Sequence, residues 1–181
     1  MTIEFILGCS ASLCFRFALG LEMEQDVLSN QPLFLLFLCS SGGRLILTTN
    51  YVSLQGDTVI VESGGLIDSS GHGYSAGSGP GSGSGSTGGS YASPGGRASS
   101  GNQYGSLYWP DQPGSGGGYG AGGGWLHIVT GNTVFVEGTI RSNGIGSSST
   151  SNGGGSGGAV VVNTLFLKGY GTIECHGGLS K

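Results

Sequence analysis

The side chains best suited to acid–base chemistry or metal binding are few in this chain, and they stand apart from one another. The chain has 181 residues, of which 3 are His, 4 are Cys and 10 are Asp or Glu. His72, His127 and His176 lack the spacing of a metal site, and no Cys-x-x-Cys pair signals zinc or a redox pair. The glycine runs lack the Gly-Lys-Ser or Gly-Lys-Thr of a phosphate-binding loop. We therefore expect no metal site and no cofactor.

The carboxylates are spread singly along the chain. Hydrolysis of a glycosidic bond needs paired acids, and a calcium-dependent lyase needs clustered acids with a basic residue nearby. The chain contains neither an Asp-Asp pair nor a Gly-Gly-x-Gly-x-Asp calcium repeat. The acids expected on solvated faces are Asp57, Glu62, Asp68, Glu137 and Glu174. No complete catalytic constellation is present, so we expect a protein that is not an enzyme.

Aromatic residues gather in a glycine-rich segment, residues 72–124. Aromatic rings among Gly and Ser stack on sugar rings, or they anchor a loop to the wall behind it. The sequence leaves both interpretations open, and glycine with tyrosine also suits adhesive or cell-wall material. The side chains that we expect to face a ligand are His72, Tyr74, Tyr104, Tyr108, Trp109 and Tyr119.

The strands expected to position these side chains belong to a sequence motif that occurs three times. An apolar strand motif occurs at residues 58–62, 133–137 and 164–168. After each copy come a glycine-containing bend and a segment running from Ile to Gly, at 67–71, 140–144 and 173–177. Upstream of each copy, a glycine pair leads into a short apolar strand, at 44–47, 125–128 and 159–162. Repetition of this kind indicates a solenoid, in which each coil buries its apolar side against its neighbours.

The repeated strands are continuously apolar, which is typical of parallel strands that are packed on both sides. We predict an all-β fold, a right-handed parallel β-helix (β-solenoid) of about three turns with a long glycine-rich loop insertion at 72–124. Equivalent residues of successive turns would stack about 4.8 Å apart. The predicted columns are Ile67, Ile140 and Ile173; Val59, Val134 and Leu165; Val61, Val136 and Leu167; and, on the opposite face, Ile60, Phe135 and Phe166.

The same alignment predicts polar ladders beside the isoleucine column. Arg141 would lie between the carboxylates of Asp68 and Glu174. One ladder would contain Ser70, Asn143 and His176, and another Ser69, Ser142 and Cys175. We expect Cys175 to be a free thiol at a small outward or corner position.

Residues 1–41 differ from the rest and divide the chain into an apolar N-terminal segment and a glycine-rich β-region at 42–181. The first segment holds two apolar runs, Ile3–Leu21 and Leu33–Leu38, separated by acidic residues. Its start lacks the Lys or Arg of a secretory signal, and neither run reaches the ~18 uninterrupted apolar residues of a membrane span. A signal, a membrane anchor and an artefact of sequence assembly all remain open as interpretations.

Composition excludes some classes of partner. Glycine accounts for 41 residues, whereas charged residues make up only 9% and the net charge is -4. Six basic residues scattered singly give no electrostatic footprint for nucleic acid, so we expect no nucleic-acid partner. The low charge also argues against an ordinary cytosolic protein, in which charge keeps the surface soluble.

The glycine-rich segments carry a resemblance to a known family. These segments are 71–81, 104–106, 113–118 and 153–158. Their order over residues 42–181 resembles glycine-rich, pectin-lyase-like β-helix regions of large extracellular or cell-surface proteins. One departure is the run Ser93–Arg97, which replaces a His-Gly-Gly often found in such loops.

The resemblance implies a structural or adhesive module at an extracellular or cell-surface location, with a polysaccharide or matrix partner. It also implies further β-helix turns, and the chain ends at Lys181 directly after a repeat. We therefore expect a fragment of a longer protein.

An alternative function is binding or cleavage of carbohydrate. Gly71-His72-Gly73 resembles a segment of polygalacturonases, which share the β-helix fold. Those enzymes also need an Asn-Thr-Asp, whereas this chain has Asn163-Thr164-Leu165. The departure leaves the carboxylate chemistry of that family without its residues here.

Overall fold

The protein is all-β and is built from parallel strands. The computed structural model describes residues 36–96, 101–146 and 152–179, and these ranges contain strands and no helix. The strands are β1 (Leu36–Cys39), β2 (Arg44–Ile46), β3 (Tyr51–Val61), β4 (Leu66–Asp68), β5 (Trp125–Val136), β6 (Thr139–Arg141), β7 (Ala159–Asn163), β8 (Phe166–Lys168) and β9 (Thr172–Glu174). The strands form two sheets, and every pairing in them is parallel.

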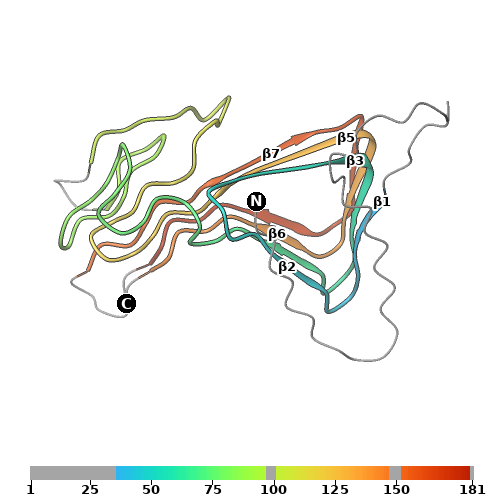
Figure 1. Ribbon diagram of the computed structural model, residues 1–181, viewed down its shortest axis with the longest axis horizontal. Helices are drawn as coiled ribbons and strands as arrows, with labels where there is room; N and C mark the ends of the chain where they lie inside the picture. The colour runs from blue at the N-terminus through green and yellow to red at the C-terminus, as the bar shows by residue number, and fades with distance from the viewer. Residues whose placement is uncertain (1–35, 97–100, 147–151, 180–181) are drawn as a thin grey trace, which may run out of the picture.

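Each sheet takes its strands in chain order. One sheet has the order β1-β3-β5-β7, with β8 also paired to β5, and the other has the order β2-β4-β6-β9. Figure 1 looks along the stack, so successive strands of each sheet lie nearly one behind another, while the glycine-rich segments extend to one side. The chain therefore passes from one sheet to the other and back, and each pass adds a strand next to its predecessor.

The predicted isoleucine column is confirmed. Ile67 pairs with Ile140, and Ile140 pairs with Ile173. The neighbouring pairs Val59–Val134 and Val61–Val136 lie in register in the other sheet and are fully or almost fully buried. These columns form the apolar core between the two sheets.

The third copy of the strand motif lies two residues away from its predicted register. Leu167 pairs with Val134 instead of Val136, and Phe166 pairs with Thr133 instead of Phe135. The predicted places of Leu165 and Leu167 were therefore wrong. Val134 lies six positions before Ile140, and Leu167 lies six positions before Ile173. The last two coils therefore have equal spacing between these columns, whereas in the first coil Val59 lies eight positions before Ile67 and both residues still pair in register with the second coil.

The predicted upstream strand of the first copy was also wrong. Arg44–Ile46 forms β2 and pairs with β4, whereas the segment in register with Trp125–Ile128 is Tyr51–Leu54. Tyr51–Leu54 and Trp125–Ile128 both alternate between outer side chains and side chains that face the core, as strands with only one face on the core do. The sheet also starts before the expected boundary at residue 42, because Leu36–Cys39 pairs with β3.

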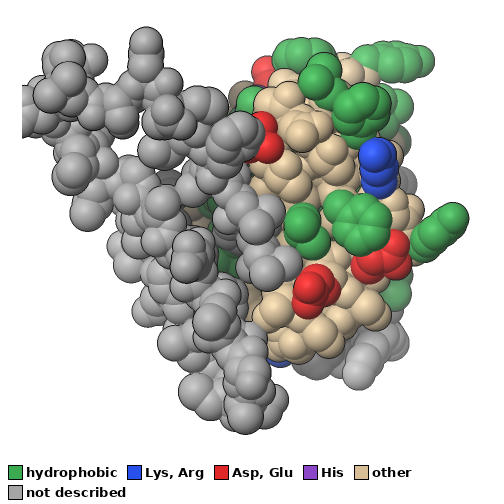
Figure 2. All heavy atoms as spheres, turned by 90° about the vertical axis from the view of Figure 1, so that its right-hand side faces the viewer, with side chains coloured by type: hydrophobic (Ala, Val, Ile, Leu, Met, Phe, Trp, Pro, Cys, Tyr) green, Lys and Arg blue, Asp and Glu red, His purple; other side chains and the backbone are tan. Residues whose placement is uncertain are grey.

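The surface on the side of β1, β3 and β5 is mixed. Figure 2 shows hydrophobic side chains there lying among acidic and basic ones. Among the charged residues of these strands and their turns, Glu62 and Lys168 are exposed. Where described residues are visible on this side, hydrophobic side chains are interspersed with charged and polar ones, and the buried apolar core lies inside the stack.

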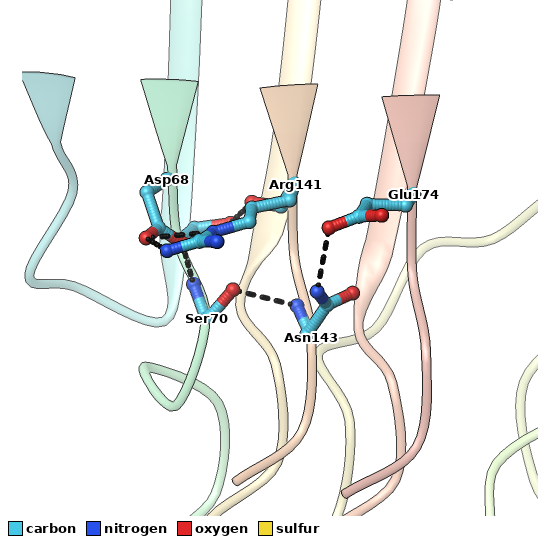
Figure 3. Close-up of polar contacts among 6 residues, drawn as sticks. Asp68, Ser70, Arg141, Asn143 and Glu174 are labelled. Atoms are coloured by element: carbon cyan, nitrogen blue, oxygen red, sulfur yellow. Dashed lines mark hydrogen bonds and ion pairs between the residues drawn. The ribbon is translucent and has the colours of Figure 1, made fainter. Parts of the chain in front are cut away.

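Polar side chains beside the isoleucine column form the predicted charged ladder (Figure 3). Arg141 lies in register between Asp68 and Glu174. Its Nε and Nη2 donate to Asp68 Oδ2 at 2.9 and 2.6 Å. Glu174 instead accepts a hydrogen bond from Asn143 Nδ2 at 2.9 Å. The ion pair therefore joins β4 to β6, and an amide joins the end of β6 to β9.

The second polar ladder lies two residues further along the chain. The backbone N–H of Asn143 donates to Ser70 Oγ at 2.9 Å, and the backbone N–H of His176 donates to Asn143 Oδ1 at 2.7 Å. Between the two ladders, Ser69 and Ser142 are fully buried, so their position points inward. The expected outward position is therefore wrong for Ser69 and Ser142, whereas Cys175 is an exposed free thiol, as expected.

The Asp68–Arg141 pair makes stability depend on pH. Burial acts to raise the pKa of Asp68, but hydrogen bonds from Arg141 and Ser70, together with the Arg141 charge, lower that pKa by more. The ionised carboxylate therefore contributes stability above the ordinary pKa of 3.8, and this contribution is lost as pH falls through the lower folded-state pKa.

We expect Asp68→Asn to lower the free energy of unfolding by ~1 kcal/mol at neutral pH. The difference from the parent protein should shrink as the pH falls through the acid range, because the parent then loses the same charge. Urea denaturation of both proteins at several pH values measures this difference. A difference that stays constant down to acid pH would show that the ion pair is not its source.

Candidate ligand-binding face and cavity

The glycine-rich segments form a layer held together through backbone groups. Within the insertion, Gly114 N–H donates to Gly123 O at 2.8 Å, and Gly122 N–H donates to Tyr74 O at 2.9 Å. The insertion also bonds to the later loop, for instance from Gly89 N–H to Gly154 O at 2.9 Å. A Cβ added to Gly122 would overlap the carbonyl group of Gly114. Glycine is therefore needed because neighbouring backbones approach too closely for a side chain.

Next to this layer, the outer surface of β3 and β5 carries an aromatic face, defined as Tyr51, Trp125 and His127. Tyr51 and Trp125 are in register on adjacent strands, and their ring centroids lie 5.8 Å apart. His127 follows two residues after Trp125 on the same side of β5, with ring centroids 5.2 Å apart. These rings therefore form a short row on the outer surface of a flat parallel sheet.

Part of the insertion is docked against the aromatic face. Trp125 Nε1 donates to Pro110 O at 2.9 Å, and Tyr51 OH donates to Gln112 Oε1 at 3.0 Å. These bonds hold the segment that carries Tyr108 and Trp109, whose side chains are 96% and 71% exposed. The arrangement places two further exposed rings on a loop that is tied to the edge of the aromatic face.

Uncharged polar groups lie beside the aromatic face on these strands, and Asp111 on the docked loop lies near Tyr51. Ser53 is in register with His127, and Asn163 on β7 lies in register with Val129. Asn163 Nδ2 and His127 Nε2 lie 3.1 Å apart in an exposed contact. Apolar rings flanked by hydroxyl, amide and imidazole groups suit a neutral ligand that has both apolar faces and hydroxyl groups, as sugars do.

A cavity of about 540 Å³ opens between the insertion and the later glycine loop. It is lined by residues of the insertion between 86 and 110, among them Tyr91 and Leu107, by residues 152–160, and by Cys175, Gly177 and Gly178. The ring of Tyr91 packs edge-on against Tyr104 at a centroid distance of 5.0 Å. Burial raises the pKa of Tyr91, so its phenol stays neutral at physiological pH. Among the described residues, no charged side chain lines the cavity.

The six residues expected to face a ligand are dispersed over the insertion. Tyr104 OH donates to Pro113 O at 2.6 Å, and burial raises the pKa of Tyr104 to about 12. This ring therefore anchors the loop. Tyr108, Trp109 and Tyr119 are exposed. His72 and Tyr74 are half-buried, with backbone N–H groups that donate to Ser69 O and Gly114 O. None of the six lines the cavity.

Sequence reasoning missed Tyr51, Trp125 and Tyr91. The signal for the first two was available, because Tyr51–Leu54 and Trp125–Ile128 share the same alternation of outer and apolar residues. The prediction instead matched 44–47 to 125–128 through their preceding glycine pairs. Tyr91 had no such signal, because only the folded loop brings it to the cavity.

In the ranges 36–96, 101–146 and 152–179, no group of three or more His, Cys, Asp or Glu side chains is placed to hold a metal ion. The same part of the chain contains no helix long and apolar enough to cross a membrane. Comparison of the chain with protein-family models, with curated proteins and with solved structures found no match in any of the three.

Proposed function

We propose that this chain is a non-catalytic adhesive module of an extracellular or cell-surface protein, built on a right-handed parallel β-helix. The chain-order pairing of both sheets and the isoleucine column support the β-helix. In such a stack each coil is held by its neighbours on both sides, which makes a rigid support for surface side chains. The glycine layer adds a second set of backbone hydrogen bonds between successive coils.

The aromatic face is the observation that carries the adhesive role. Tyr51, Trp125 and His127 are held on strands, so they lose little conformational freedom when a ligand binds. Trp109 lies on a loop that is fastened to the same strands. The partner that fits this chemistry is a neutral polysaccharide, whose sugar rings stack on aromatic side chains while its hydroxyl groups bond to amides.

We expect Trp109→Ala and Tyr51→Ala each to weaken binding of a neutral polysaccharide about tenfold, which corresponds to ~1.4 kcal/mol. Affinity electrophoresis in gels that contain soluble β-glucan, xylan or galactomannan measures this change. Tyr170→Ala is the matched control, because Tyr170 is 97% exposed and lies beyond β8, outside the aromatic face.

Stacking of sugar rings on aromatic side chains should change little with salt concentration. Equal retardation of the parent and both aromatic variants in every gel would contradict the proposal. Release of shorter sugars from a retained polysaccharide would instead favour the alternative, a carbohydrate-cleaving β-helix.

A further inference from the structure

The last strands of both sheets form an open edge. Within the described residues, β7, β8 and β9 pair with β5 and β6 on one side only. The backbone N–H and C=O groups on the other side of an edge strand are a template for pairing with another chain.

Side chains at this edge continue the buried columns but are themselves uncovered. Ile67 and Ile140 are fully buried, whereas Ile173, which completes their column, is 40% exposed. Leu167 completes the column of Val59 and Val134 in the same way and is 56% exposed. The same kind of side chain at the same place in the repeat is therefore buried only where a further strand follows.

We infer that β8 and β9 of one molecule pair with β1 and β2 of a second copy, so that molecules stack end to end. Within the described residues, β1 and β2 are the opposite ends of the two strand orders. Leu45 starts the isoleucine column, since it pairs with Ile67, and Phe37 stands at the register position of Val59. Continuing the registers into the second copy places its Leu45 over Ile173 and its Phe37 over Leu167.

Charge favours this orientation. Glu174 lies on β9 at the open edge, and Arg44 is an exposed residue of β2. In the continued register, Arg44 of the second copy lies diagonally opposite Glu174 on the same outer side. Diagonal neighbours on adjacent strands are about 7–8 Å apart, within reach of an arginine side chain. Because the two joined surfaces differ, the contact repeats without closing, and assemblies grow beyond the dimer.

Sedimentation velocity of the full chain over a wide concentration range tests the inference. We expect species that grow with concentration past the dimer. Ile173→Lys should weaken association at least tenfold, because it places a charge on the covered column. Leu107→Lys is the matched control, since Leu107 is 78% exposed on the insertion and should leave association unchanged.

Swapping the charges of Arg44 and Glu174 distinguishes end-to-end stacking from non-specific association. Arg44→Glu and Glu174→Lys should each weaken association, and the double variant should recover most of it. Circular dichroism melts identify any variant that does not fold, and Leu167→Lys then replaces Ile173→Lys. A parent protein that stays monomeric throughout, a closed dimer, or association that is indifferent to both lysine substitutions would overturn the inference.

Discussion

Replacing Ile140 by alanine is expected to lower the free energy of unfolding by about 3–4 kcal/mol. Ile140 is fully buried, and it lies between Ile67 and Ile173 in the column that joins β4, β6 and β9. The truncation removes apolar surface from the core and leaves a cavity. The cavity cannot close easily, because strands in register on both sides hold the neighbouring side chains in place. Equilibrium urea denaturation, followed by circular dichroism, measures the loss.

The matched control for this prediction is Ile173→Ala, the same change in the same column. Ile173 is 40% exposed, so part of its surface is already in water and a smaller cavity forms. We expect a cost of about 1 kcal/mol, provided that the measurement is made at a dilution where molecules do not associate. Equal costs for the two variants would mean that Ile140 and Ile173 do not differ in burial as the stack requires.

The isoleucine column could be predicted because its signal is local and repeated. Each of the three isoleucines follows a glycine-containing bend and precedes a polar residue and a closing glycine. A parallel stack turns such a repeated local pattern directly into contacts, since equivalent residues of successive coils become neighbours. The ion pair of Asp68 with Arg141 followed from the same alignment, one residue further along.

The predicted register of the third copy was wrong for a different reason. The prediction aligned the third copy at its threonine, whereas Leu167 lies opposite Val134 in the structure. A shift of two residues keeps each side chain on the same face of its strand, so the apolar pattern alone cannot detect it. Turn length does not decide between the registers either, because Val59–Ile67 spans eight positions and Val134–Ile140 six, yet both pairs are in register.

The aromatic face and the glycine layer were harder to predict for separate reasons. Tyr51 and Trp125 lie far apart in the sequence, and they meet only once β3 and β5 are correctly aligned. The glycine layer has no pattern of side chains from which to choose partners. A glycine in the sequence indicates that a side chain is not needed, but the neighbouring backbone that excludes one is known only from the fold.

Replacing Gly122 by alanine is expected to lower the free energy of unfolding by about 3 kcal/mol. Gly122 is buried, and a Cβ there would overlap the carbonyl group of Gly114. Moving either backbone would stretch the hydrogen bonds that Gly122 makes, from its N–H to Tyr74 O and from Gly73 N–H to its own carbonyl, at 2.9 and 2.8 Å. These bonds join the two ends of the insertion, so the damage should spread through the layer. Urea denaturation gives the loss of stability, and limited proteolysis of the insertion gives its location.

Gly177→Ala is the matched control, and its expected effect has the opposite sign. Gly177 lies in the same glycine-rich layer and is exposed, and a Cβ there would meet Gly155 O only at 3.8 Å, an ordinary contact. Alanine restricts the unfolded chain more than glycine does, so this substitution should be neutral or stabilise the fold by up to ~1 kcal/mol. If both substitutions were harmless, the segments of the layer would be further apart than the structure places them. If both were equally costly, backbone conformation rather than close packing would be the reason for glycine.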